Sequence, residues 1–281
     1  MEDYLKKIIR DALDEDIQSG DVTTQAIIPE SAFGNGKFLI MANGVIAGLR
    51  VAQKVFQAVD EGIVFNQFVD DGKKVKRGEI VVEVTGKASS ILTAERTALN
   101  FLQRMSGIAT LTNKFVGEIR HTKAKILDTR KTVPGLRLLD KEAVRLGGGK
   151  NHRIGLFDMF LIKDNHIEIA GSITKAIEAC RNFQQKNNSN LKIEVETKNL
   201  DEVKEALSCN ADIIMLDNFT TDSMRKAVRL IKEKCLVEAS GNINLENVKQ
   251  VAEMGVDFIS VGALTHSVKA LDISLEVELE Q

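Results

Sequence analysis

Residues 128–166, DTRKTVPGLRLLDKEAVRLGGGKNHRIGLFDMFLIKDNH, decide the fold of this chain. This segment holds eight Lys and Arg against five Asp and Glu, whereas the whole chain has a formal net charge of −2. A short apolar run, residues 125–127, ends where the segment begins, and a second one, residues 159–162, lies within it. Cations placed where apolar strands end suit a small ligand with several negative charges.

The middle of this segment predicts a helix followed by a glycine turn. Apolar residues at 136, 139, 143, 144 and 146 form a stripe at helical spacing, which places Lys141 on the solvent face. Gly147, Gly148 and Gly149 follow, and glycines allow the backbone to come close to a ligand. A solvated basic helix is the plain alternative for the whole cluster, but Arg-Lys and Asn-His-Arg beside glycine-rich turns favour a binding site.

From residue 125 onward, short apolar strands alternate with helical stripes. The predicted strands cover residues 125–127, 160–163, 193–196, 213–216, 236–239 and 258–261. The predicted helices between them cover residues 173–183, 203–207, 224–231 and 248–254. Continuous rather than alternating hydrophobicity is typical of parallel strands covered by helices. The pattern therefore predicts an incomplete parallel α/β barrel.

The first part of the chain has a different rhythm. We expect a helix over 4–16, a turn over 20–24, a helix over 49–59, a helix opening at Ser89 and a separate one over 110–119. Extended segments are expected over 32–41, 63–69 and 79–84. The fold class is therefore α/β, with an N-terminal α/β sandwich-like domain over 1–112 and the barrel domain over 113–267. The tail 268–281 is expected to pack with the N-terminal domain.

Composition excludes several classes of function. The net charge of −2 argues against general nucleic-acid binding, and aromatic residues make up only 5% with no Trp. Three cysteines lie far apart, which indicates a reducing compartment, the cytoplasm, and no zinc site. No apolar run approaches the roughly 18 residues that a membrane span needs. We therefore expect no nucleic-acid or membrane partner.

The predicted strand ends carry polar and charged residues, which in parallel barrels gather at one rim. They read 128–131, 163–166, Glu196, 217–218, 240–242 and 262–263. The last two are small-residue turns of the kind that cradle a phosphate. Glu196 and Asp217 are candidate Mg²⁺ ligands, because Mg²⁺ prefers oxygen ligands and often bridges to substrate phosphates. Ion pairing of these two carboxylates with Lys131 or Lys163 is an equally weighted alternative.

Several long motifs in this order resemble the quinolinate phosphoribosyltransferase family, also called nicotinate-nucleotide pyrophosphorylase (carboxylating). They are DTRKTVPGLR, GGGKNHR, LIKDNH, EVE, MLDNF, EASGNI and VGALTHS, together with ERT at 95–97 and SGIAT at 106–110. The resemblance covers nearly the whole chain. It implies an enzyme of NAD biosynthesis that joins quinolinate to phosphoribosyl pyrophosphate with Mg²⁺, giving nicotinate mononucleotide, pyrophosphate and CO₂.

The resemblance also implies roles for individual residues. The quinolinate side would be lined by Arg96, Arg130, Lys131, His152, Arg153 and Lys163. Glu196 and Asp217 would face the ribose and the metal, and with Lys131 and Lys163 they form the predicted catalytic set. The phosphate loops would hold Ser240, Gly241, Gly262, Ala263 and His266, and Thr129, Asn242 and Val261 complete the predicted substrate-binding residues. The family is dimeric, so we expect a homodimer or a higher oligomer in which Arg96 reaches the partner's site.

Two alternatives remain at this point. A relative found beside molybdate-transport genes shares the fold but has no settled substrate, and formation of nicotinate mononucleotide from quinolinate separates it from the enzyme. A non-catalytic barrel that binds a sugar phosphate would bind ligand without releasing pyrophosphate.

Overall fold

The computed structural model describes residues 2–279, which divide into two compact units. Within this range the first comprises residues 2–113, 133–148 and 268–279, and the second comprises Lys114–Thr132 and Gly149–Ser267. No helix in the described range is both long and apolar enough to cross a membrane. Each unit has its own sheet and its own buried apolar core.

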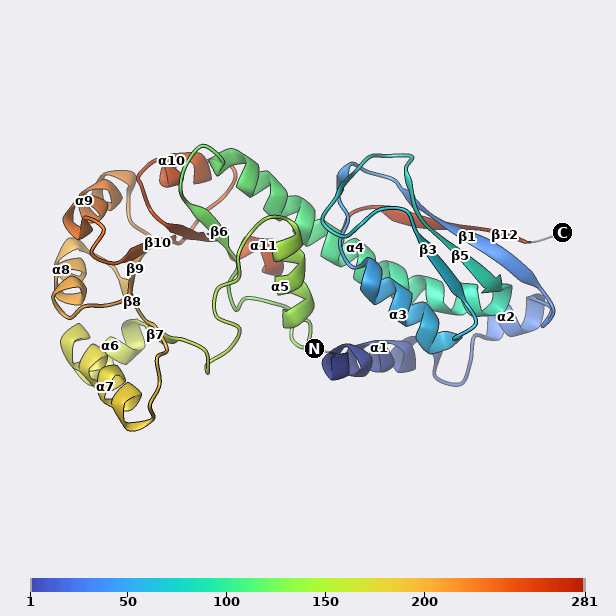
Figure 1. Cartoon of the computed structure of the whole chain (residues 1–281), viewed down its shortest axis with the longest axis horizontal. Helices are drawn as coiled ribbons and strands as arrows, with labels where there is room; N and C mark the ends of the chain where they lie inside the picture. The colour runs from blue at the N-terminus through green and yellow to red at the C-terminus, as the bar shows by residue number, and fades with distance from the viewer. Residues whose placement is uncertain (1, 280–281) are drawn as a thin grey trace. The chain divides into compact units, whose positions relative to one another are not determined.

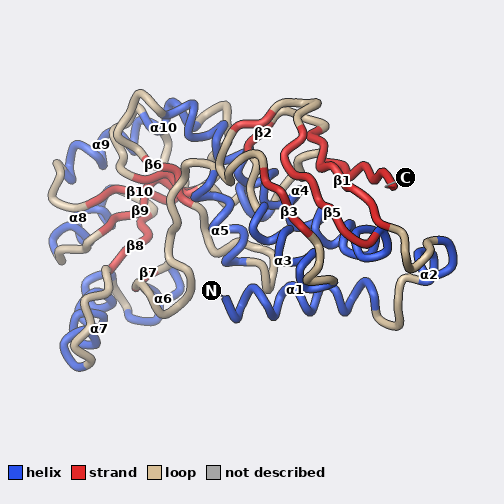
Figure 2. The backbone as a smooth tube through the Cα atoms, turned by 45° about the vertical axis from the view of Figure 1, so that its right-hand side comes forward, coloured by secondary structure: helices blue, strands red, loops and turns tan. Residues whose placement is uncertain are grey.

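The first unit is built on a four-stranded sheet in the order β12-β1-β5-β3. Its strands are antiparallel: β1 (Phe33–Ile40), β3 (Val64–Gln67), β5 (Ile80–Lys87) and β12 (Ile273–Leu279). The C-terminal strand β12 pairs with β1. A short ladder joins β2 (Gly44–Val45) and β4 (Lys74–Val75). Figure 2 shows β1, β3 and β5 running side by side.

Helices complete the first unit: α1 (Glu2–Ile17), α2 (Val22–Ile27), α3 (Leu49–Val59), α4 (Ala88–Ile119, which continues into the second unit) and α5 (Arg137–Leu146). The aromatic rings of Phe38, Phe56 and Phe65 pack together with centroids 5.8 to 6.3 Å apart. A Cβ on Gly36 of β1 would stand 3.4 Å from Ile91 of α4, so that helix lies against the sheet.

The second unit is built on six parallel strands in the order β6-β11-β10-β9-β8-β7. They are β6 (Lys125–Leu127), β7 (Phe160–Ile162), β8 (Ile193–Thr197), β9 (Ile213–Asp217), β10 (Leu236–Ser240) and β11 (Phe258–Ser260). Residues 213–216 of β9 are all buried, as expected for a central strand with both faces covered. The parallel α/β arrangement predicted from the alternating pattern is confirmed.

Helices cover this sheet: α6 (Asp164–Ala170), α7 (Ile173–Lys186), α8 (Leu200–Ser208), α9 (Thr221–Ile231), α10 (Val248–Ala252) and α11 (Ala263–His266). In Figure 1, helices α7 to α10 lie outside the curve formed by strands β7 to β10. In the described residues β6 and β7 form the two ends of the sheet, so the barrel is incomplete as predicted. Lys150 pairs with Leu127 along the free edge of β6, and its amide donates to the carbonyl of Ile126.

Two local predictions in the first unit were wrong. The expected break between helices at 89 and 110–119 does not exist, because α4 is continuous from Ala88 to Ile119. Ser106 and Gly107 lie inside it for packing reasons: Ser106 Oγ accepts from the amide of Ala47, and a Cβ on Gly107 would stand 2.3 Å from the carbonyl oxygen of Lys269. The expected turn at 20–24 instead opens α2, whose N-cap is Asp21.

The segment 133–148 also departs from expectation, because it belongs to the first unit and not to the barrel domain. Arg104 of α4 donates through Nε and Nη2 to the fully buried carboxylate of Asp140 in α5, at 2.9 and 2.8 Å. Lys141, expected on the surface, is only 2% exposed. A Cβ on Gly147 would stand 2.5 Å from the carbonyl oxygen of Ala109, so this glycine permits close helix packing instead of ligand approach.

Candidate active site

The carboxyl ends of strands β6 to β11 surround one cavity of about 830 Å³. Each strand of the parallel sheet, or the loop that follows it, contributes to the lining, because the ends of parallel barrel strands converge on one rim. Fifteen of the sixteen predicted binding residues line it: Thr129, Arg130, Lys131, His152, Arg153, Lys163, Glu196, Asp217, Ser240, Gly241, Asn242, Val261, Gly262, Ala263 and His266. Arg96, the sixteenth, is an exposed residue of α4 in the first unit.

Two guanidinium groups lie on one side of the cavity. The buried Nε atoms of Arg130 and Arg153 have no hydrogen-bond partner among the described residues. Arg153 donates through Nη1 to the carbonyl of Met159 at 3.2 Å. Burial and the nearby charge of Arg130 lower the pKa of Arg153. Two adjacent guanidinium groups whose Nε donors have no hydrogen-bond partner among the described residues indicate a binding site for an anion.

The loop after β6 holds Lys131 at the same rim. The backbone amide of Lys131 donates to Thr129 Oγ1 at 3.0 Å, and the carbonyl of Lys131 accepts from Thr265 Oγ1 at 2.8 Å. A Cβ on Gly262 would come within 3.1 Å of both the Lys131 and the His266 side chains. The loops after β6 and β11 therefore lie in direct contact, and this glycine allows that approach.

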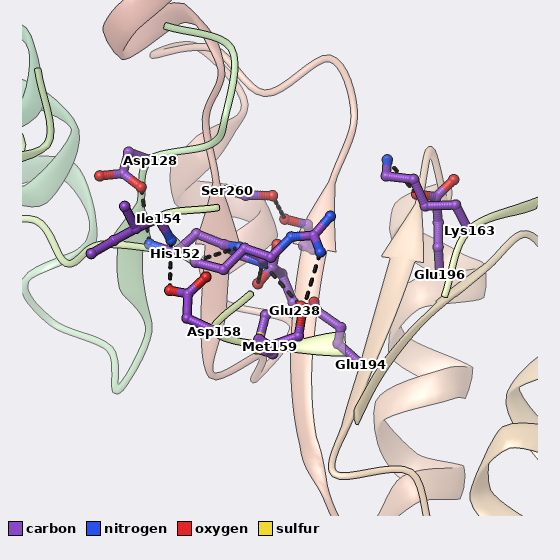
Figure 3. A network of polar contacts seen from close by, with 12 residues as sticks. Asp128, His152, Ile154, Asp158, Met159, Lys163, Glu194, Glu196, Glu238 and Ser260 are labelled. Carbon is purple, nitrogen blue, oxygen red and sulfur yellow. Dashed lines mark hydrogen bonds and ion pairs between the residues drawn. The ribbon is translucent and has the colours of Figure 1, made fainter. Parts of the chain in front are cut away.

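Lys163 and Glu196 form an ion pair across two neighbouring strands. Lys163 follows β7, Glu196 lies in β8, and their Nζ and Oε2 atoms are 3.1 Å apart. Figure 3 shows this pair on the opposite side of the view from the His152 cluster. Ion pairing with Lys163, which the sequence offered as an alternative to metal binding by Glu196, is therefore present in this structure.

Asp217 ends β9 beside a turn that requires glycine. Asp217 Oδ2 accepts from the side-chain amide of Asn218 at 2.9 Å. Asn218 Oδ1 accepts from Asn242 Nδ2 at 3.0 Å, which ties the loops after β9 and β10 together. Gly241 between them has φ +96°, a conformation that favours glycine.

His152 lines the cavity and contacts two buried glutamates. It follows Lys150 along the edge of β6, and its backbone amide donates to Asp128 Oδ1 at 2.9 Å. Its Nε2 lies 2.9 Å from Glu194 Oε2 and 3.5 Å from Glu238 Oε2 (Figure 3). The side chains of His152, Glu194 and Glu238 are 7%, 0% and 1% exposed.

The tautomer of this imidazole follows from its partners. Its Nδ1 accepts from the backbone amide of Arg153 at 2.8 Å, so the ring proton resides on Nε2 and is donated to Glu194. Both ring nitrogens are therefore used inside the protein. His152 lines the cavity as predicted, but its contact with a substrate would not come from a ring nitrogen in this arrangement.

Burial sets the protonation of the two glutamates. It raises the pKa of Glu238 to about 8, with the charge of Glu194 adding to the effect. It also raises the pKa of Glu194 to about 7. The carboxyl of Glu238 has no close hydrogen bond, since His152 Nε2 lies 3.5 Å from its Oε2. At neutral pH, Glu238 is therefore predominantly a neutral acid.

Two sets of residues could hold a metal ion. His152, Glu194 and Glu238 have ligand atoms within 4.8 Å of one another, which no other group of three His, Cys, Asp or Glu achieves in the described chain. Glu196 and Asp217 are two carboxylates on the adjacent strands β8 and β9, both lining the cavity. Two carboxylates fit Mg²⁺ that retains water and bridges to substrate phosphates.

Family models match both parts of the chain. One, described as the quinolinate phosphoribosyl transferase N-terminal domain, matches residues 21–106, and the corresponding C-terminal domain matches residues 108–276. The chain belongs to the quinolinate phosphoribosyltransferase family. A family member from Nicotiana tabacum, named quinolinate phosphoribosyltransferase [decarboxylating] 2b, mitochondrial, is 46% identical, covering 98% of this chain and 83% of the relative.

Other members of the family agree with this assignment. A Bacillus subtilis protein named probable nicotinate-nucleotide pyrophosphorylase [carboxylating] is 42% identical, covering 98% of this chain and 94% of the relative. The solved structure of nicotinate-nucleotide pyrophosphorylase from Francisella tularensis is 44% identical, covers 99% of this chain and 97% of that one, and has a TM-score of 0.93. The two-domain α/β fold predicted from the sequence is therefore confirmed.

Two buried acids of this quinolinate phosphoribosyltransferase were not predicted from the sequence: Glu238, which lines the cavity, and Glu194, which contacts His152. Each lies within a strand, whereas the predicted site residues come from the strand ends. The sequence did contain a signal, because each glutamate interrupts an otherwise apolar run. Burying an unpaired acid costs free energy, so such a residue is a candidate for a functional site. The lining also includes Leu161, Met215, Asn218, Ile243 and Ser260, none of which was predicted to bind substrate.

Proposed function

We propose that this chain transfers phosphoribosyl from phosphoribosyl pyrophosphate to quinolinate with decarboxylation, giving nicotinate mononucleotide, pyrophosphate and CO₂ in NAD biosynthesis. The observation that carries the proposal is the pair of guanidinium groups of Arg130 and Arg153, whose buried Nε donors have no partner among the described residues. They line one cavity with the ammonium groups of Lys131 and Lys163. Two carboxylates on one aromatic ring match such a set of cations.

The cations would orient the pyridine ring. Planar guanidinium forks bind carboxylates with two hydrogen bonds, which holds the ring nitrogen in a defined direction. The nitrogen then bonds to the anomeric carbon of the ribose while pyrophosphate leaves. Positive charge builds up on the ribose in that step, and the carboxylates of Glu196 and Asp217 on the same rim would stabilise it.

Decarboxylation would follow from the first step. The alkylated ring nitrogen is cationic, so it stabilises the electron pair left on the adjacent carbon when CO₂ departs. None of this requires a covalent nucleophile. The work of the protein is to orient the two substrates and to supply fixed charge.

We propose that Glu196 and Asp217 hold Mg²⁺ together with water and the pyrophosphate group. Mg²⁺ bound there would neutralise charge on the leaving pyrophosphate. Lys163 forms the ion pair with Glu196 at 3.1 Å and also lines the cavity, so it would position this carboxylate. The small-residue turns at Ser240–Gly241 and Gly262–Ala263 would bind the phosphate of the ribose.

We propose that the enzyme is a homodimer in which Arg96 acts in the partner's site. Arg96 is exposed on α4 and is not part of the cavity lining of its own chain. An Arg96→Ala variant mixed with a Lys131→Ala variant should regain activity, because one hybrid site then carries both intact residues. Failure of subunit mixing to restore any activity would contradict the shared site.

The activity itself is tested with purified protein, quinolinate, phosphoribosyl pyrophosphate and Mg²⁺. We expect consumption of quinolinate with equal amounts of pyrophosphate and nicotinate mononucleotide. Nicotinate, which has one carboxylate fewer, is the matched control substrate and should react poorly. Binding of phosphoribosyl pyrophosphate without pyrophosphate release would instead support a non-catalytic barrel.

We propose the cytoplasm as the compartment, because Cys180, Cys209 and Cys235 are free thiols. Relatives differ in this respect, since plant family members are named mitochondrial or chloroplastic. Fractionation of cells that express the chain natively would decide the compartment.

A further inference from the structure

Loss of CO₂ leaves an electron pair on a ring carbon, and that carbon must receive a proton before the product is complete. This requirement rests on the proposed function. Among the lining side chains that can carry a proton, Lys131 and His266 are exposed residues of the loops after β6 and β11. We therefore compare the other candidates, His152, Lys163 and Glu238. Their contacts distinguish them.

His152 is a poor proton donor in this structure. Its Nδ1 accepts from the Arg153 amide, so the only ring proton is on Nε2. Loss of that proton would produce an imidazolate, which is unfavourable. The same N–H also donates a hydrogen bond to Glu194 Oε2 at 2.9 Å. A relay through the ring is blocked as well, because a relay needs both nitrogens free to exchange a proton.

Lys163 is held in an ion pair. Its ammonium lies 3.1 Å from Glu196 Oε2, and its loss of a proton would leave that carboxylate without its partner. Glu238 differs from both. It lines the cavity, its side chain is 1% exposed, and its contact with His152 Nε2 is long, at 3.5 Å.

We propose that Glu238 is the acid that protonates the ring carbon from which CO₂ leaves. The carbon–carbon bond breaks and its electron pair stays on the ring carbon. The carboxylic acid of Glu238 then gives its proton to that carbon, which forms the carbon–hydrogen bond and leaves a carboxylate. Water reprotonates Glu238 between turnovers, so no oxidant or further reactant is needed.

The surroundings keep Glu238 in the form that this role requires. Glu194 faces it from β8, His152 faces it from the segment after Lys150, and Ser260 lies on β11. Met215, the β9 residue level with Glu238, is apolar. Burial and the Glu194 charge raise the pKa of Glu238 to about 8, so the acid retains its proton at neutral pH. A neutral acid also avoids repelling a substrate with two carboxylates.

The test separates the two chemical steps. In Glu238→Gln, which keeps the size of the side chain but cannot give a proton, rapid-quench experiments should show pyrophosphate release close to the parent rate. Formation of nicotinate mononucleotide should fall by about 100-fold or more, as expected for loss of a general acid. Glu238→Asp retains the acid and should restore part of the lost rate, while Glu178→Gln on the exposed face of α7 should match the parent.

Several outcomes would overturn the proposal. They are equal loss of pyrophosphate release and product formation, unchanged product formation, and a stoichiometric metal ion in the parent that is absent from Glu238→Gln. If Glu238→Gln does not fold, the parent enzyme still decides: its product-forming step should slow above about pH 8 while pyrophosphate release does not. An absence of that difference would contradict the role. If the parent releases no pyrophosphate from the two substrates, the proposed function fails instead.

Discussion

Gly241 lies so close to Asn218 that a Cβ on the glycine would stand 2.2 Å from the Asn218 side-chain oxygen and 3.0 Å from its backbone nitrogen. The φ of Gly241 is +96°, so a larger residue would meet both backbone strain and a collision. Asn218 in turn donates to the carboxylate of Asp217. The turn after β10 therefore affects the position of a proposed metal and ribose ligand.

Gly241→Ala should lower kcat/KM for phosphoribosyl pyrophosphate by at least about 10-fold, because displaced Asn218 would no longer hold Asp217. Gly78→Ala is the matched control: its φ is +88°, but nothing lies within 4 Å of the added Cβ. The control isolates backbone strain, which costs about 1 kcal/mol of stability. Steady-state kinetics of both variants make the comparison, and equal kinetics in the two would refute this role for the turn.

Arg130→Ala should raise KM for quinolinate or abolish turnover, because the remaining cations cannot replace a guanidinium fork. Loss of one charge-assisted contact of about 2 kcal/mol corresponds to roughly 30-fold in kcat/KM. Arg225→Ala, which removes an exposed arginine of α9, should have little effect. Quinolinate titrations at saturating phosphoribosyl pyrophosphate measure the difference. Unchanged quinolinate kinetics in Arg130→Ala would rule out a role for Arg130 in binding quinolinate.

Removal of Mg²⁺ with a chelator should stop turnover, and added Mg²⁺ should restore it. Asp217→Asn keeps the size of the side chain but weakens a hard cation site, so it should raise the Mg²⁺ concentration needed for half-maximal activity by about 10-fold or more. Activity measured over a Mg²⁺ series in parent and variant tests this. A Mg²⁺ dependence identical to that of the parent would mean that Asp217 is not a ligand.

The stability of the parent should fall as pH rises from 6 to 8. Glu238 keeps its proton up to about pH 8 when folded, because burial raises its pKa, whereas in the unfolded chain it ionises near its ordinary value of 4.5. Unfolding in this window therefore releases a proton, and higher pH favours the unfolded chain. Glu238→Gln should reduce the loss of unfolding free energy between pH 6 and 8 by on the order of 2 kcal/mol.

Urea unfolding of parent and Glu238→Gln at pH 6, 7 and 8 measures this effect. Glu178→Gln provides the control, since its carboxylate is exposed and its removal should leave the slope unchanged. Parallel slopes for parent and Glu238→Gln would show that Glu238 is ionised in the folded protein.

Much of the second unit could be predicted from the sequence, because each parallel strand is a continuous apolar run that ends in polar residues. The predicted strand at 125–127 matches β6, and each of the others lies within one residue of the observed strand at either end. The clustering of the strand ends could also be predicted, since strand direction alone brings Lys131, Lys163, Glu196 and Asp217 around one cavity. Their individual roles remain predictions.

Other features could not be read because they depend on contacts between distant segments. Ser106 and Gly107 lie in the gap between the two helices expected from the sequence. They are inside α4 because the backbone of Lys269 packs so close to Gly107 that only a glycine fits there. Lys141 looks like a surface cation because its burial depends on how α5 packs in the first unit. The buried acids Glu194 and Glu238 come together only when β8 and β10 are placed on either side of β9.

The most direct measurement follows the carboxylate that the proposed reaction removes. Quinolinate labelled with carbon-13 at the carboxylate adjacent to the nitrogen should release labelled CO₂ in equal amount to pyrophosphate and nicotinate mononucleotide, and only when phosphoribosyl pyrophosphate and Mg²⁺ are both present. Release of pyrophosphate without labelled CO₂, or no reaction of quinolinate under conditions in which the protein is folded, would contradict the assignment of this cavity to quinolinate.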